Sequence, residues 1–178
     1  MGTVKPPLKG ILFTSLLYNK TVEPENVFEV LEKEFGSIIL TSTPFVFKET
    51  DYYKNEMGPD LTRVFAAFDY FIEGDRIADI KIKTNRIEDT IFSAKRNRTV
   101  NIDPGYVTNA KVVLATTKNF QHRIYMKKGI FAEITLRYRG KSYEPWEWTF
   151  KDYRLKESID FFNNLRAVYR AKVNELIK

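Results

Sequence analysis

The chain has 178 residues, 43% hydrophobic and 29% charged, a balance typical of one folded domain with its own apolar core, so we expect a single domain over residues 1–178. The absence of cysteine excludes disulfides, thiol nucleophiles, thiolate zinc sites and iron–sulfur clusters. With His122 as the single histidine, a zinc site built from several histidines is also excluded.

Membrane and export signals are absent from the sequence. No segment approaches the roughly 18 consecutive apolar residues of a transmembrane helix. Residues 1–9 lack the apolar stretch of a secretory signal. We therefore expect a soluble cytoplasmic protein with no membrane partner.

Positive charge is concentrated in the middle of the chain. The formal net charge is +6, but residues 95–128 carry +7, with eight Lys and Arg against one Asp. Residues 1–94 carry −4 and residues 129–178 carry +3. The central block indicates attraction for phosphate or another anion; the alternative is a solvated set spread around the fold.

The first half of the chain predicts alternating strands and helices. Residues 8–17 form an apolar run typical of a buried strand, and Pro24 to Gly36 has the spacing and end signals of a helix. Residues 37–47 and 62–72 are rich in β-branched and aromatic residues and predict two more strands. Residues 77–91 fit both a helix and a strand, and the helix is preferred because its pattern persists beyond eight residues.

A short strand then follows at residues 98–102, closed by a turn at Asp103-Pro104-Gly105. This order predicts an α+β fold with a ferredoxin-like antiparallel sheet (βαββαβ) covered by helices on one face. Residues 107–117 fit a helix or a strand, and Trp146 to Phe150 predicts one more strand.

A C-terminal β-hairpin and a long terminal helix are expected to extend this sheet. The hairpin spans residues 121–138, and the helix begins near Leu155 with Asp152 as its N-cap. Alternation in the second hairpin strand predicts a buried apolar face, formed by Ile130, Ala132, Ile134, Leu136 and Tyr138. A two-residue turn places His122 on the other, polar face beside Glu133, with Arg137 further along, whereas a three-residue loop places it on the apolar face; we expect the first arrangement.

Several short strings are too particular to be explained by packing alone: Asp51-Tyr52-Tyr53, Glu56-Met57-Gly58, Thr84-Asn85, Asn101 to Tyr106, Leu114 to Lys118, His122 to Tyr125, Ala132 to Leu136 and Asp152-Tyr153-Arg154. Together they resemble the domain-of-unknown-function family 4416, from about residue 9 to residue 170. The resemblance implies no established activity, and the cofactor stays unknown.

The tripeptide Gly140-Lys141-Ser142 looks like the end of a phosphate-binding P-loop. However, Thr135 occupies the position of the required first glycine, and the residues after Ser142 cannot open a helix. The tripeptide is therefore predicted to be a hairpin turn.

The residues of the central basic block are the first candidates for a ligand site. Lys111, Lys118, Arg123 and Arg137 are candidate anion partners, and Tyr106 is a candidate for stacking against a base. The preferred function is a binding module or small enzyme for a phosphate-bearing ligand, either a nucleotide or a single-stranded nucleic acid.

Two alternatives of other classes stay open. In the first, the protein is a hydrolase or transferase in which His122 works with Glu133 or Asp103 as acid and base. The structural interpretation is that His122 only stabilises the fold and that Asp103 only stabilises a turn. In the second alternative, the chain is a protein-interaction domain without catalysis. A divalent metal bound by converging carboxylates is a further hypothesis without a spacing motif, and its candidates are Asp51, Glu56, Asp103, Glu133 and Asp152.

Overall fold

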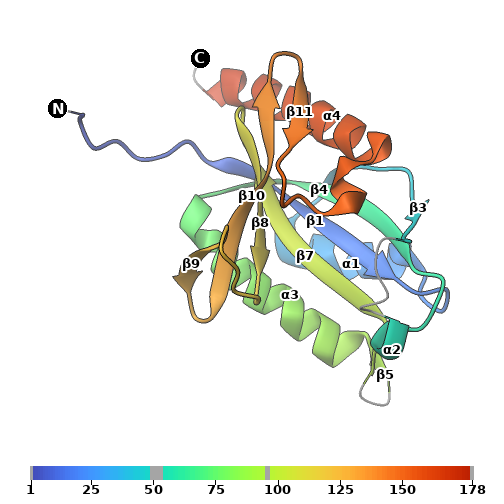
Figure 1. The fold of residues 1–178 in the computed structure, drawn as a ribbon. Helices are drawn as coiled ribbons and strands as arrows, with labels where there is room; N and C mark the ends of the chain where they lie inside the picture. Colours follow the sequence, from blue (N-terminus) through green and yellow to red (C-terminus); the bar gives the residue numbers. More distant parts are fainter. Residues whose placement is uncertain (1, 49–53, 95–96, 177–178) are drawn as a thin grey trace.

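The computed structural model describes residues 2–48, 54–94 and 97–176. Its centre is a nine-stranded antiparallel sheet with the order β11-β10-β8-β7-β1-β4-β2, in which β3 pairs with β4 and β9 with β10 (Figure 1). The strands of this sheet are β1 (Gly10–Tyr18), β2 (Ile38–Thr41), β3 (Phe45–Val46), β4 (Thr62–Ile72), β7 (Val100–Val107), β8 (Lys111–Thr116), β9 (Ile124–Lys127), β10 (Ile130–Arg139) and β11 (Ser142–Pro145). A separate small hairpin is formed by β5 (Ser93–Ala94) and β6 (Asn97–Arg98).

Helices cover both faces of the sheet. The helices α1 (Pro24–Phe35) and α3 (Ile77–Ile91) pack on one face, and α4 (Lys156–Leu176) packs on the other (Figure 1). The shorter elements are the one-turn helix α2 (Lys54–Met57) and the 3₁₀ turns η1 (Gly74–Arg76) and η2 (Lys151–Arg154). The expectation of helices on one face therefore holds for α1 and α3 but not for α4, whose apolar stripe buries the opposite face.

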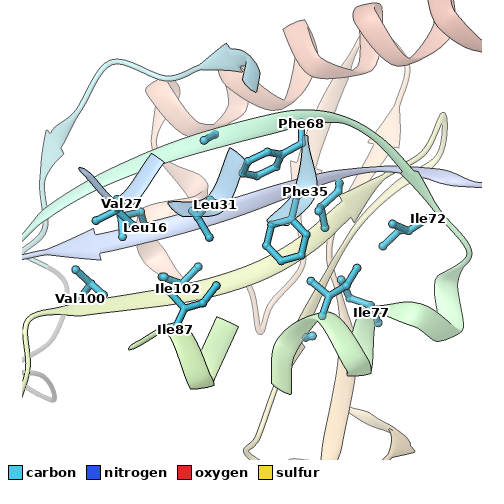
Figure 2. Close-up of a cluster of buried hydrophobic side chains, with 14 of the residues drawn as sticks. Leu16, Val27, Leu31, Phe35, Phe68, Ile72, Ile77, Ile87, Val100 and Ile102 are labelled. Carbon is cyan, nitrogen blue, oxygen red and sulfur yellow. The ribbon is translucent and has the colours of Figure 1, made fainter. Parts of the chain in front are cut away.

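Each helical layer has its own apolar core. Figure 2 shows the first, in which Leu31 of α1 lies beside Leu16 of β1 and Ile87 of α3 lies beside Ile102 of β7. In the second core, Phe162 of α4 meets Phe13 of β1 edge to face, with ring centroids 5.0 Å apart. Burial of these large side chains on both faces supplies most of the driving force for folding. Among the described residues, none of the helices is both long and apolar enough to cross a bilayer.

The strongly patterned elements are confirmed. The helix predicted from Pro24 is α1, with proline in its first turn and Gly36 after its end at a φ of 85°. The strand predicted over residues 62–72 is β4, and residues 77–91 are the helix α3 rather than a strand. Residues 111–116 are the strand β8.

Three local predictions are wrong. Asp103-Pro104-Gly105 is not a turn but continues β7, because β1 pairs with every residue of that strand. Trp146 to Phe150 is not a strand, whereas the preceding residues form β11. Asp152 does not cap α4: it lies in η2, and its carboxylate pairs with the buried Arg63 guanidinium, Nε to Oδ2 2.9 Å.

Both predicted hairpin turns are present. Gly140, at a φ of 60°, turns the chain between β10 and β11, so the P-loop-like tripeptide is a turn. Lys128 and Gly129 form the two-residue turn between β9 and β10. The predicted burial of β10 is wrong in part, because the Glu133 and Thr135 side chains are buried while Ile134 is 37% exposed. Arg123 and His122 pair with Glu133, and Thr149 bonds the Thr135 carbonyl.

The sheet opens between β7 and β8, and this opening positions the site. β8 pairs with β7 only from Gly105 to Val107, although β7 begins at Val100. The backbone groups of Ile102 point toward the free edge, where they bond side chains of α3. Pro104 points the same way two residues later and has no N–H to donate, so the ladder to β8 ends there.

Candidate functional site

A cavity of about 410 Å³ lies where β7 and β8 part. Its walls come from segments far apart in sequence: α2, α3, β5 to β8, the loop after β8, β10 and the segment before η2. Most lining residues are polar or charged, and the full set is Glu56, Lys81, Asn85, Glu88, Asp89, Ser93, Arg98, Asn101, Asp103, Leu114 to Lys118, Arg123, Glu133 and Phe150. Convergence of so many titratable groups on one concave site is the main physical mark of a functional site.

Helix α3 contributes a polar stripe that the sequence analysis missed. Lys81, Asn85, Glu88 and Asp89 follow one another at spacings of four, three and one residues, which places them on one side of a helix. The stripe lies beside the apolar residues that bury α3 against the sheet. The sequence of α3 therefore did contain a signal for this stripe, namely a polar helix face next to an apolar one.

Lys81 and Glu88 satisfy the free edge of β7. The Lys81 ammonium donates to the Ile102 carbonyl at 2.9 Å and to Asp103 Oδ1 at 2.8 Å. The Ile102 N–H donates to Glu88 Oε1 at 2.8 Å. These buried side chains replace the strand that would otherwise pair there, so part of the charged cluster is built into the fold.

The two carboxyl groups beside Lys81 are shifted in opposite directions. Burial, with a smaller effect of the Asp103 charge, raises the pKa of Glu88 against the opposing effects of Lys81, the Ile102 N–H and Arg98. Burial would also raise the pKa of Asp103, but Lys81, Arg63 and a hydrogen bond from Asn101 together lower it below its ordinary value. Environments that shift the pKa values of two neighbouring carboxyl groups apart in this way are frequent at functional sites.

Arg98 joins α3 to α2 at the outer end of the cavity. Its Nε and Nη2 donate to both carboxylate oxygens of Glu56, at 2.6 and 2.9 Å, and Nη1 donates to Glu88. The hydrogen bonds from Arg98 lower the pKa of Glu56, and the same contacts raise the pKa of Arg98. The pairing is bidentate, a geometry that fixes the planar guanidinium in place.

Replacing Glu56 by glutamine is expected to change the acid dependence of folding. Because the folded-state pKa of Glu56 lies below its ordinary value of 4.5, its contribution is present above that pH and is lost as pH falls through the lowered pKa. The variant should be less stable than the wild type near neutrality by at most about 1 kcal/mol, since the pair is partly exposed. Urea unfolding between pH 7 and 2 measures this difference, and a constant difference at all pH values would contradict the assignment.

The wall formed by β10 carries a second buried cluster. Arg123 Nε donates to Glu133 Oε2 at 2.8 Å, and an Arg123 Nη donates to the Lys118 carbonyl at 3.0 Å. His122 Nε2 lies 3.2 Å from the same carboxylate oxygen, as expected from the sequence. Glu133 thus orients Arg123, which lines the cavity with Lys118.

His122 lies behind this wall in a column of aromatic rings. Its imidazole stacks on Trp148, with centroids 5.3 Å apart, and Phe120 meets it edge to face. Trp148 stacks in turn on Trp146 at 5.1 Å. His122 is not among the residues that line the cavity, although the carboxylate it contacts is. Its contact with the site is therefore indirect, through the Glu133 carboxylate.

The other candidate ligand residues lie away from the cavity. Arg137 places its guanidinium over the Trp146 ring, 4.2 Å from the centroid. Lys111 is opposite Arg137 in the β8–β10 ladder, at the far end of β8 from Lys118. The Tyr106 ring packs against Gly10 of β1. The structure therefore brings together Asp103, Lys118, Arg123 and Glu133 from the predicted set, but not these three.

Much of the central positive charge has carboxylate partners. Lys127 and Lys128 both bind Asp79 on α3, at 2.9 and 3.2 Å, and Arg98 and Arg123 are paired as described above. Lys95 and Arg96 lie outside the described residues. The described part of the linear charge cluster is thus divided among the cavity wall, the tip of the β9–β10 hairpin and Lys111 at the start of β8.

The carboxylates considered for a metal are only partly gathered. Glu56, Asp103 and Glu133 line the cavity, Asp152 is paired with Arg63, and Asp51 lies outside the described residues. Within the part of the chain that the structure describes, no three acidic or histidine side chains form a group able to hold a metal ion.

Comparison with known proteins and protein families gives one match. The family model described as "Domain of unknown function (DUF4416)" matches residues 9–169. No curated protein and no solved structure matches this chain.

Proposed function

We propose that this chain, which belongs to the DUF4416 family, binds a small phosphate-bearing ligand such as a nucleotide in the cavity between β7 and β8. The observation that carries the proposal is the meeting of Lys118 and Arg123 with the polar stripe of α3 around one cavity. A volume of about 410 Å³ lies in the range of small-molecule sites.

A phosphate group fits the wall formed by Lys118 and Arg123. Arg123 is held by Glu133 through one edge of its guanidinium and by the Lys118 carbonyl through another, so its position is set before a ligand arrives. A preorganised cation in a partly enclosed site binds phosphate more strongly than a mobile surface lysine. Phe150, 47% exposed and 5.9 Å from the Arg123 guanidinium, offers a ring face at the same wall.

A small ligand is favoured over a long single strand of nucleic acid. Polyanion binding depends on a groove of uncompensated cations. Here the cavity also contains five carboxylates, and the hairpin lysines are paired with Asp79.

Acid–base catalysis by a hydrolase or transferase is the second candidate. The contact between His122 and Glu133 supports it, because Glu133 lines the cavity and His122 faces the same carboxylate oxygen. In this version Glu133 is the group next to the ligand and His122 is its positioning residue.

We further propose that the first part of the chain has a ferredoxin-like core. The strands β7-β1-β4-β2 are adjacent in that order, all neighbours are antiparallel, and α1 and α3 lie on one face. This arrangement is the split βαβ pattern that the element order predicts.

Lysines at the two ends of β8 provide a matched test of the binding site. In calorimetric titrations with adenosine monophosphate and with inorganic phosphate, Lys118→Gln is expected to weaken binding about tenfold, the loss of one charge-assisted contact. Lys111→Gln should bind like the wild type, because Lys111 lies outside the cavity. Equal losses in both variants, or no binding by the wild type at millimolar concentrations, would contradict the proposal.

A further inference from the structure

Asp89 lies near the C-terminus of its helix, the less favourable end for a negatively charged side chain. It lies in the last turn of α3, which ends at Ile91, and that turn contains no basic residue. The C-terminus of a helix carries partial negative charge, so a carboxylate there is destabilising and a cation is stabilising. Asp89 is also exposed at the rim of the cavity.

Its neighbour Glu88 has charged partners, whereas the Asp89 side chain has none among the described residues. Glu88 is bound by Arg98 and the Ile102 N–H, with the Lys81 ammonium at 3.8 Å. Within residues 2–48, 54–94 and 97–176, the Asp89 side chain makes no hydrogen bond or ion pair. The Asn85 side chain, one turn earlier on the same polar stripe, likewise has no hydrogen-bond partner in this part of the chain. Two polar groups that face one cavity are therefore available to a ligand.

The two walls of the cavity differ in charge. The wall formed by α2, α3, β6 and β7 contains four carboxylates against two cations, Lys81 and Arg98. The wall formed by the end of β8 and by β10 contains Lys118 and Arg123 against Glu133. An occupant that carries a positive charge at one end and a negative charge at the other would complement both walls.

We propose that the ligand carries a cationic amine in addition to its phosphate, and that the amine binds at Asp89 and Asn85. This inference rests on the proposed function, which assigns the phosphate to Lys118 and Arg123. The ammonium would donate to the Asp89 carboxylate and the Asn85 side-chain oxygen, and it would offset the negative end of α3. The proposed ligand is thus a phosphate ester that also carries an amino group, rather than a phosphate ester with negative charge alone.

Two probes of similar size test this assignment. Phosphoethanolamine carries a phosphate and an ammonium, whereas glycerol 3-phosphate carries hydroxyl groups in place of the ammonium. Calorimetric titrations at constant ionic strength should show the wild type binding phosphoethanolamine about fivefold more tightly, the effect of one rim ion pair. Asp89→Asn should abolish this preference by weakening the binding of phosphoethanolamine, and it should not weaken the binding of glycerol 3-phosphate, because the carboxylate it removes repels a phosphate in the same cavity.

The matched control is Asp75→Asn, which changes an exposed aspartate in η1, outside the cavity. This variant should keep the wild-type preference. Asp89→Asn should melt at or above the wild-type temperature, because it removes an unfavourable charge from the end of a helix. That result shows that any lost preference is not a folding defect.

Equal binding of the two probes by the wild type would overturn the inference and leave the phosphate proposal standing. A loss of preference in Asp75→Asn equal to that in Asp89→Asn would also overturn it. If neither probe nor inorganic phosphate binds, both the inference and the proposed function fail.

Discussion

Replacing Glu88 by alanine is expected to reduce the free energy of unfolding by about 3 kcal/mol. The Glu88 side chain is 1% exposed and lies among Lys81, Arg98 and the Ile102 N–H. Alanine would leave that N–H without its acceptor at the free edge of β7 and would remove the carboxylate that the buried Lys81 and the partly buried Arg98 share. Guanidinium unfolding, monitored by circular dichroism, measures the loss.

Two further variants define the cause. Glu88→Gln keeps an acceptor for the Ile102 N–H but removes the charge, so its loss should fall between those of the wild type and Glu88→Ala. Glu34→Ala removes a carboxylate whose partner Lys83 is exposed, and should cost less than about 1 kcal/mol. A loss in Glu88→Ala no larger than that in Glu34→Ala would show that the cluster does not stabilise the free edge.

The elements that the sequence predicts well are those whose signals are local. Pro24 and Gly36 bound a helix because proline suits a first turn and glycine adopts the positive φ after the last one. Residues 62–72 form β4 as predicted because β-branched and aromatic residues occupy a strand that is buried along most of its length. Neither element depends on a distant partner for its identity.

The failures occur where a distant partner decides the conformation. Asp103-Pro104-Gly105 has the composition of a turn, but pairing with β1 extends it, and the free edge beside Pro104 is completed by α3. Glu133 has a polar side chain on a strand, yet it is buried because Arg123 and His122 pair with it. Local propensity does not report such tertiary pairings.

Only part of the candidate site was predicted, again because distant tertiary contacts are not visible in the local sequence. Asp103, Arg123 and Glu133 stood out in unusual short strings, and all three line the cavity. Of the α3 stripe only Asn85 did, because a helix that buries Ile77 and Ile87 is expected to have a polar side that simply faces water. Only the parting of β7 from β8 turns that side into a wall.

Replacing Gly105 by alanine is expected to destabilise the protein by about 3 kcal/mol, the upper end of overpacking effects in a core. Gly105 is where β7 and β8 last approach before they separate. A Cβ atom there would overlap the Val113 carbonyl oxygen and would lie 2.5 Å from Cζ of the buried Phe13 ring. Because one of these neighbours is backbone, the strain could be relieved only by moving β8 away from β7.

The control is Gly74→Ala, whose added Cβ would lie 3.1 Å from the Tyr106 hydroxyl, a side-chain atom that can move. It should change the free energy of unfolding by less than about 1 kcal/mol. Guanidinium unfolding compares the two variants, and equal effects would contradict the steric account. Since β8 also carries Thr116 and leads to Lys118 in the cavity wall, Gly105→Ala should weaken phosphate binding as well, whereas Gly74→Ala should not.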